Sequence, residues 1–148
     1  FIFHGICIGA AGGILAITLR KCPYVKAIVT EGMFPRFYES MKNNLIDKKK
    51  PVFIFIDMID FWMKHYTGHS MKFGPLDVID KLEVPLLMLH SKEDKFSKPD
   101  FAVKLYEKAG SKIKHLEWFD HGAHSMIRIN NMEHYDKAIN DFLDKIIS

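Results

Sequence analysis

Cys7, Asp94 and His124 are the side chains of this sequence whose types and surroundings suit nucleophilic catalysis. Cys7 stands in Gly5-x-Cys7-x-Gly9, the spacing of a sharp turn that carries a nucleophile from a strand to a helix. A histidine can take up the thiol proton, and a carboxylate can orient the histidine. Together the three residues could form a thioester with an acyl group and then release that group to water.

The turn around Cys7 is expected to join a strand to a helix. Residues 1–3 are apolar, with aromatic and β-branched side chains that favour a strand, and residues 9–19 form a helix rich in small residues. Such a turn strains the nucleophile's dihedral angles and leaves no room for side chains two positions before and after it. The helix dipole would favour a thiolate, and the Ile8 N–H would serve the oxyanion hole. By itself, the motif fits equally well a packing turn in which Cys7 is a small buried hydrophobe.

Asp94 and His124 each come shortly after a predicted strand. The strand before Asp94 is apolar throughout, as in a parallel sheet covered on both faces, and the strand before His124 alternates with period two, as at a sheet edge. Because ligand sites of α/β sheets lie at the carboxyl ends of the strands, both residues are expected near Cys7. Glu93 is an alternative acid, and His121 is an alternative base.

These residues require a scaffold in which strands and helices alternate. Hydrophobic periodicity predicts strands at 1–3, 25–30, 84–90 and 112–119, and helices at 9–19, 34–45, 51–66, within 74–82, from 99 to 109 and after 130. The order of elements predicts an α/β fold with a parallel sheet, right-handed crossovers and helices on both faces. We expect residues 1–148 to form a single domain.

Residues 34–74 stand between two predicted strands and are expected to form a helical lid or insertion. Apolar residues on several sides of the 51–66 helix suggest contacts on several sides. We predict that this segment lines the substrate pocket and that Phe34, Phe55 and Trp62 bind substrate, since ligand pockets are lined mainly by apolar and aromatic groups. The alternative is that these helices simply cover the sheet.

The composition is that of a globular domain with one core. The chain has 148 residues, of which 48% are hydrophobic and 26% charged, with a net charge of +3. No basic stripe with interleaved aromatics is present, so nucleic acid is not an expected partner. No apolar stretch reaches the ~20 residues of a membrane span. Cys22 is expected to be structural, and so few cysteines suit a reducing compartment, which favours a cytoplasmic location.

The eight histidines raise the question of a metal site, and their spacing argues against one. His65 and His69 have a His-x-x-x-His spacing but lie on a stretch broken by glycine, with no carboxylate ligand beside them. His4 and His90 are expected to be structural histidines near strand ends. We expect neither a metal nor another cofactor.

Three segments of the chain match a family pattern in the same order. The first reads His4-Gly-Ile-Cys-Ile-Gly-Ala10, the second begins Val84-Pro-Leu and continues to Asp94 and Pro99, and the third is Gly122-Ala-His-Ser125. In this the chain resembles the C-terminal half of α/β-hydrolase fold proteins, most closely esterase and acyl-peptidase-like members. The resemblance covers essentially the whole chain and implies a Cys7–His124–Asp94 triad.

Two features depart from the family pattern. Cysteine replaces the usual serine, as it does in dienelactone hydrolases. The first half of the fold, which supplies the second oxyanion donor, is missing, so we expect the chain to be the C-terminal part of a longer protein. The resemblance implies an esterase-like hydrolase that cleaves a carboxylic ester, thioester or lactone of a small-molecule acyl substrate. The alternatives are an acyltransferase and a catalytically degenerate member that acts as a binding protein.

Overall fold

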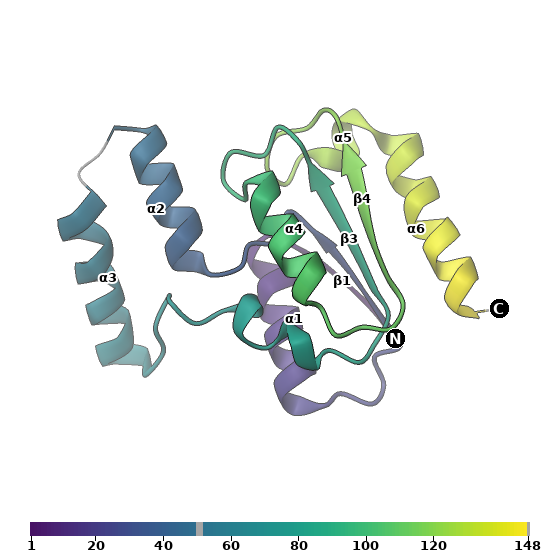
Figure 1. The fold of residues 1–148 in the computed structure, drawn as a ribbon, viewed down its shortest axis with the longest axis horizontal. Helices are drawn as coiled ribbons and strands as arrows, with labels where there is room; N and C mark the ends of the chain where they lie inside the picture. Colours follow the sequence, from purple (N-terminus) through teal and green to yellow (C-terminus); the bar gives the residue numbers. More distant parts are fainter. Residues whose placement is uncertain (50–51, 148) are drawn as a thin grey trace.

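A computed structural model describes residues 1–49 and 52–147 and contains a four-stranded parallel sheet (Figure 1). The strands lie in the order in which they occur in the chain, and each pairs in parallel with the next. They are β1 (Ile2–Ile6), β2 (Ala27–Glu31), β3 (Leu86–Ser91) and β4 (Lys114–Phe119). The predicted α/β class is therefore confirmed, and all four carboxyl ends lie at one edge of the sheet.

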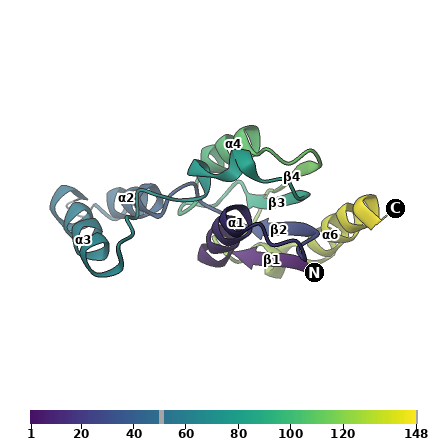
Figure 2. The ribbon, with the colours of Figure 1, turned by 90° about the horizontal axis from the view of Figure 1, so that it is seen from below.

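Helices cover both faces of this sheet, as the sequence predicts (Figure 2). Helices α1 (Ile8–Arg20) and α4 (Pro99–Lys108) pack on one face, and α6 (Met132–Ile147) packs on the other. The remaining helices are α2 (Phe37–Asp47), α3 (Val52–Thr67) and α5 (Ile127–Asn130), with single 3₁₀ turns η1 (Pro75–Asp77) and η2 (Ile79–Lys81). Pro99 is the first residue of α4, where its missing N–H costs no hydrogen bond. None of the described helices combines the length and the hydropathy needed to cross a membrane.

The core has two halves because side chains alternate across the central strands. Ile28 and Met88 pack with α1 and α4 on one face, whereas Val29 and Leu87 pack with α6 on the other. Every residue of β2 and β3 is buried, as expected for strands covered on both sides. The sheet is thus a rigid base for the loops at its carboxyl edge.

Helices α2 and α3 extend away from the sheet, and α2 lies between α3 and the rest of the molecule (Figures 1 and 2). Arg36, which precedes α2, anchors this pair of helices by donating from Nε and Nη2 to both oxygens of Asp77, at 2.9 and 2.5 Å. Asp60 of α3 accepts hydrogen bonds from the Ser70 hydroxyl at 2.8 Å and the Met71 N–H at 2.6 Å. Asp60 therefore joins α3 to the loop that follows it.

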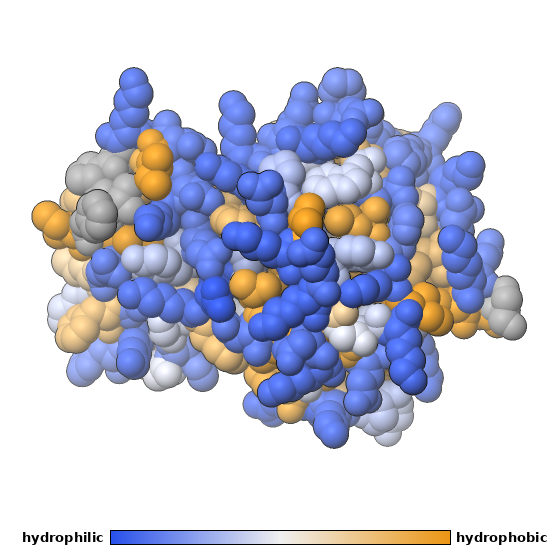
Figure 3. Space-filling model, in the orientation of Figure 1, coloured by the Kyte–Doolittle hydropathy of each residue, from blue (hydrophilic) through white to orange (hydrophobic). Residues whose placement is uncertain are grey.

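The apolar residues of α3 do not make the contacts on several sides that we expected. Among the described residues, most of them are exposed, and Figure 3 shows apolar surface at this end of the molecule. The exposed side chains are Ile54, Phe55, Met58, Ile59, Phe61, Trp62 and Tyr66. Hydrophobic periodicity identified the helix correctly, but it does not determine which of several apolar faces is covered.

Candidate active site

Cys7 occupies a strained turn between β1 and α1, as the sequence predicts. Its φ of 51° and ψ of −115° lie in a region that non-glycine residues rarely adopt. The backbone N–H of Cys7 donates to the Glu31 carbonyl at 2.8 Å, which ties the turn to the end of β2. The turn therefore places the sulfur above the carboxyl edge of the sheet.

The two glycines that flank Cys7 have different roles. A Cβ on Gly5 would lie 2.7 Å from both the N and Cα atoms of Ala10, so the close approach of strand and helix requires glycine there. A Cβ on Gly9 would meet nothing within 4 Å. The expectation that both positions exclude side chains is thus wrong for Gly9, because the chain has already turned outward into α1.

This difference gives a matched pair of variants. Gly5→Ala is expected to lower the free energy of unfolding by about 1–3 kcal/mol, because backbone atoms of Ala10 must move to admit the methyl group. Gly9→Ala is expected to be neutral or to raise it by up to about 1 kcal/mol, because alanine has less backbone entropy to lose in a helix. Urea unfolding of both variants checks this, and equal losses would contradict it.

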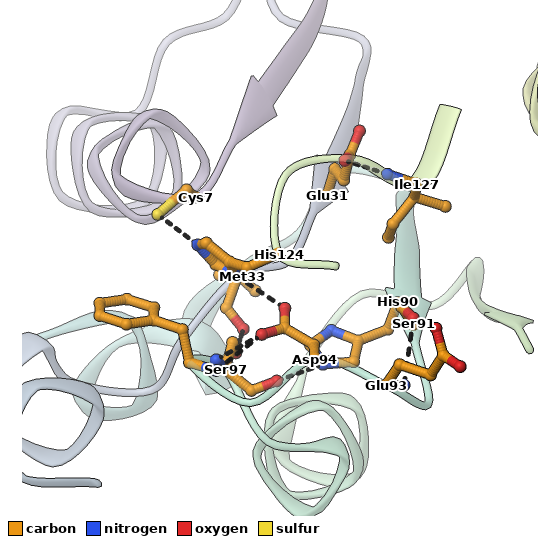
Figure 4. Close-up of polar contacts among 11 residues, drawn as sticks. Cys7, Glu31, Met33, His90, Ser91, Glu93, Asp94, Ser97, His124 and Ile127 are labelled. Atoms are coloured by element: carbon orange, nitrogen blue, oxygen red, sulfur yellow. Dashed lines mark hydrogen bonds and ion pairs between the residues drawn. The ribbon is translucent and has the colours of Figure 1, made fainter. Parts of the chain in front are cut away.

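His124 lies in the loop after β4 and joins Cys7 to Asp94 (Figure 4). Its Nε2 lies 2.8 Å from the Cys7 Sγ, and its Nδ1 lies 2.7 Å from Asp94 Oδ2. The loop bends back toward the sheet through Gly122, whose φ is 129° and where a Cβ would lie 3.0 Å from the Ile127 Cα. The structure thus brings together the three residues that the sequence singled out.

Asp94 is held in place by the loop that carries it. Its side chain is buried, and Oδ1 accepts the backbone N–H groups of Phe96 at 2.9 Å and Ser97 at 2.8 Å. The Ser97 hydroxyl in turn donates to the Met33 carbonyl at 2.7 Å. One carboxylate oxygen is therefore fixed by the backbone, which leaves Oδ2 free to orient His124.

The alternative acid and base lie outside this arrangement. Glu93 is exposed and accepts the Gly122 N–H at 3.1 Å, and its other oxygen lies 3.4 Å from His121 Nδ1. Neither side chain contacts Cys7 or His124 in any recorded hydrogen bond or ion pair of the described residues. The geometry therefore selects Asp94 and His124.

The proton on His124 is held tightly in this setting. Burial lowers the pKa of His124, but the hydrogen bonds to Asp94 and Cys7 outweigh it and raise that pKa to about 9. When His124 is protonated, both ring nitrogens are donors, Nδ1 to the Asp94 carboxylate and Nε2 to the Cys7 sulfur. By contrast, burial lowers the pKa of His90, whose Nε2 lies 2.8 Å from the Ser97 carbonyl, in agreement with a structural role.

The raised pKa of His124 predicts a dependence of stability on pH. The unfolded chain releases this proton near pH 6.5, whereas the folded chain holds it to about pH 9. The contribution of His124 is therefore fully present below pH 6.5 and is lost as the pH rises through 9, by an amount on the order of 2–3 kcal/mol. The difference in unfolding free energy between the natural chain and His124→Gln should shrink between pH 6 and pH 9.5. A constant difference would contradict the prediction.

The Ile8 N–H lies at the start of α1, next to Cys7. Ile8 is the first residue of α1, and the first four N–H groups of a helix have no partner within it. It directly follows Cys7 at the positive end of the helix dipole. Its oxyanion role remains a prediction.

The three residues predicted to bind substrate lie in different places. Phe34 is buried next to the site, with its ring centroid 6.2 Å from that of Phe96, which lies 4.7 Å from the His124 ring. Phe55 and Trp62 lie on α3, where they are 50% and 47% exposed, and the structure does not bring them to Cys7. Phe96 was not predicted from the sequence, although its position two residues after Asp94 marks it as part of the same loop.

Comparisons with known proteins show which families this chain is similar to. A family model described as serine aminopeptidase, S33, matches residues 76–130, a stretch that contains Asp94 and His124. The uncharacterized protein YqkD of Bacillus subtilis is 29% identical over 146 residues, covering 97% of this chain and 47% of the relative. The chain thus spans about half the length of the curated relative it matches.

Solved structures decide the fold. An esterase of Pyrococcus furiosus, Pf2001, superimposes with a TM-score of 0.74 at 14% identity, over 97% of this chain and 53% of the esterase. This chain has the α/β-hydrolase fold. The acylaminoacyl peptidase of Pyrococcus horikoshii superimposes with a TM-score of 0.65 at 22% identity, over 95% of this chain and 23% of the peptidase. A monoacylglycerol lipase of Paleococcus ferrophilus superimposes with a TM-score of 0.65 at 15% identity, over 98% of this chain and 68% of the lipase.

Proposed function

We propose that this α/β-hydrolase cleaves a carboxylic ester, thioester or lactone through a Cys7–His124–Asp94 triad. The observation that carries the proposal is the continuous line of contacts from Cys7 Sγ through both His124 nitrogens to Asp94 Oδ2. It is supported by the strained turn at Cys7, which resembles that of activated nucleophiles. The esterase, lipase and peptidase similarities support acyl-transfer chemistry in general.

In the proposed mechanism, the Cys7 proton resides on His124 Nε2 and the sulfur attacks the acyl carbonyl. The carbonyl oxygen becomes an oxyanion stabilised by the Ile8 N–H, and collapse of the tetrahedral intermediate breaks the bond to the leaving group, which takes the proton from His124. Neutral His124 then removes a proton from water, and the hydroxide attacks the acyl carbon. Collapse of this intermediate breaks the C–S bond, releases the carboxylic acid and restores the Cys7 thiolate beside protonated His124. Asp94 holds the tautomer of His124 and stabilises its charged form.

The surroundings of His124 favour an apolar acyl or aryl group. Phe34, Phe37 and Phe96 form an aromatic cluster with ring centroids 5.6 to 6.5 Å apart, and Phe96 lies against the His124 ring. Such side chains exclude water and fit the apolar part of a substrate. Residues 34–74 supply two of these rings, which supports our proposal that this segment is a lid or pocket wall.

Trapping the acyl-enzyme tests the proposed function. The full-length protein is mixed with p-nitrophenyl esters, thioesters and lactones, quenched in acid and analysed by mass spectrometry for a thioester on Cys7. We expect an adduct that is absent in Cys7→Ala and unaffected in Cys22→Ala, together with turnover of at least one substrate class. If neither an adduct nor turnover occurs with any class, the proposal is wrong, and a binding role would then have to be examined.

A further inference from the structure

Glu31 is a buried charged residue at the catalytic edge that the triad does not use. It is the last residue of β2 and is 2% exposed. Its neighbours in the sheet are Ile6, which directly precedes Cys7, and Leu89 of β3. In the part of the chain that the structure describes, no recorded ion pair joins it to a lysine or arginine. Burying a carboxylate without a cation is costly, so its hydrogen bonds need an explanation.

The backbone of Glu31 holds the nucleophile turn. Its carbonyl accepts the Cys7 N–H at 2.8 Å, and this contact extends the pairing of β1 and β2 by one residue into the turn. Gly32 follows with a φ of 57°, and a Cβ there would lie 3.4 Å from both Asp94 Oδ2 and His124 Nδ1. The Glu31–Gly32 segment therefore lies directly against the triad.

The carboxylate of Glu31 holds the loop that carries His124. Oε1 accepts the backbone N–H of Ile127, three residues after His124, at 3.3 Å (Figure 4). Ile127 is itself fully buried and is the first residue of α5. One residue thus contacts both segments whose separation sets the distance from Cys7 to His124.

Tyr135 fixes the orientation of this carboxylate. Its buried hydroxyl donates to Glu31 Oε2 at 2.7 Å, and His4 Nε2 lies 2.9 Å from the same hydroxyl. Because the hydroxyl proton points to the carboxylate, His4 must be the donor to the tyrosine oxygen. Burial and the nearby Glu31 raise the pKa of Tyr135, so the hydroxyl remains a donor. Each oxygen of Glu31 therefore accepts one hydrogen bond from a buried donor.

We propose that Glu31 is a positioning residue that sets the distance between the Cys7 turn and the His124 loop. This inference rests on the proposed function, since it concerns the pairing of sulfur and imidazole. The Glu31 backbone carbonyl would still accept the Cys7 N–H in any variant at position 31. The hydrogen bond to the His124 loop, by contrast, depends on the Glu31 side chain. Changing the side chain therefore separates the two contacts.

The experiment measures the alkylation of Cys7 by iodoacetamide against pH in the full-length protein, with Cys22 as internal reference. Glu31→Gln has a single acceptor oxygen facing two donors, so either the Ile127 N–H or the Tyr135 hydroxyl loses its acceptor. We expect alkylation of Cys7 at pH 6.5 to fall about tenfold, which corresponds to one pH unit in the thiolate profile. Amide hydrogen exchange at Ile127 should become faster in the same variant.

Two further variants complete the design. Tyr135→Phe leaves the Ile127 contact in place, so a smaller decrease of about threefold is expected, or about half a pH unit. Ser111→Ala removes a hydrogen bond from the buried Ser111 hydroxyl to the Val84 carbonyl at the opposite end of the sheet, and no change in the profile is expected. If Glu31→Gln does not fold, the threefold decrease in Tyr135→Phe decides the question.

The possible failures can be told apart. If the natural chain shows fast alkylation of Cys7 that depends on His124, and folded Glu31→Gln has the same profile, the positioning role is overturned while the triad stands. If Cys7 of the natural chain reacts no faster than Cys22, the proposed function fails and the inference fails with it. A slower Cys7 in Glu31→Gln together with an unchanged Ser111→Ala supports the proposal.

Discussion

His124→Ala is expected to slow the alkylation of Cys7 at pH 6.5 by about 10- to 100-fold. At this pH only about 1% of an ordinary thiol with a pKa near 8.5 is ionised, whereas a thiol whose proton resides on imidazole is largely thiolate. A stabilised thiolate is a weaker nucleophile, which offsets part of the gain from its higher thiolate fraction. The decrease in alkylation rate is therefore smaller than the ratio of the two thiolate fractions. The 2.8 Å contact between Cys7 Sγ and His124 Nε2 is the structural basis of the expectation.

Cys22 provides the control within the same molecule. It packs against the core beside α1 and contacts neither His124 nor Asp94 in any hydrogen bond or ion pair of the described residues. Its alkylation rate should therefore be the same in His124→Ala as in the natural chain. If Cys7 is no faster than Cys22, or if its rate is unchanged without His124, the imidazolium–thiolate pair does not exist.

The triad could be found in the sequence because each member is defined by local order. Cys7 is marked by its turn, and Asp94 and His124 by their positions after predicted strands. The parallel sheet then brings Cys7 and His124 into contact although 117 residues separate them. Local patterns suffice here because the carboxyl ends of parallel strands lie at one edge.

Features that depend on which distant surfaces meet could not be predicted in the same way. The contacts of Glu31 with Tyr135 and Ile127 span 104 and 96 residues, and the only signal was an acidic residue at the end of an apolar strand. Likewise, apolar periodicity in α3 did not show that Phe55 and Trp62 would lie exposed, on a helix that extends away from the sheet. Periodicity describes a single element, whereas these outcomes depend on its neighbours.

Asp94→Asn is expected to reduce turnover by about 10³- to 10⁴-fold, the size of effect seen when a triad carboxylate becomes an amide. Oδ1 already accepts the N–H groups of Phe96 and Ser97, so the amide oxygen would take this position. The amide NH₂ would then face His124 Nδ1 in place of Oδ2, because these two atoms lie 2.7 Å apart. A donor at this position forces His124 Nδ1 to be an acceptor, so that Nε2 carries the proton in neutral imidazole and cannot accept one from Cys7.

Glu93→Gln is the matched control, because the two carboxylates are adjacent in sequence but only Asp94 contacts His124. Glu93 is exposed and accepts the Gly122 N–H, a bond that the glutamine oxygen can still accept, so turnover should change by less than about threefold, or under 1 kcal/mol. The measurement is kcat/KM for the best ester substrate in both variants, with folding checked by circular dichroism. Equal effects would mean that general charge at this edge, and not the orientation of His124, supports the reaction. A large loss of turnover in Asp94→Asn, with little loss in Glu93→Gln, would assign the orienting role to Asp94. Asparagine has nearly the same shape as aspartate, so the substitution changes only whether an oxygen or an NH₂ group faces His124 Nδ1.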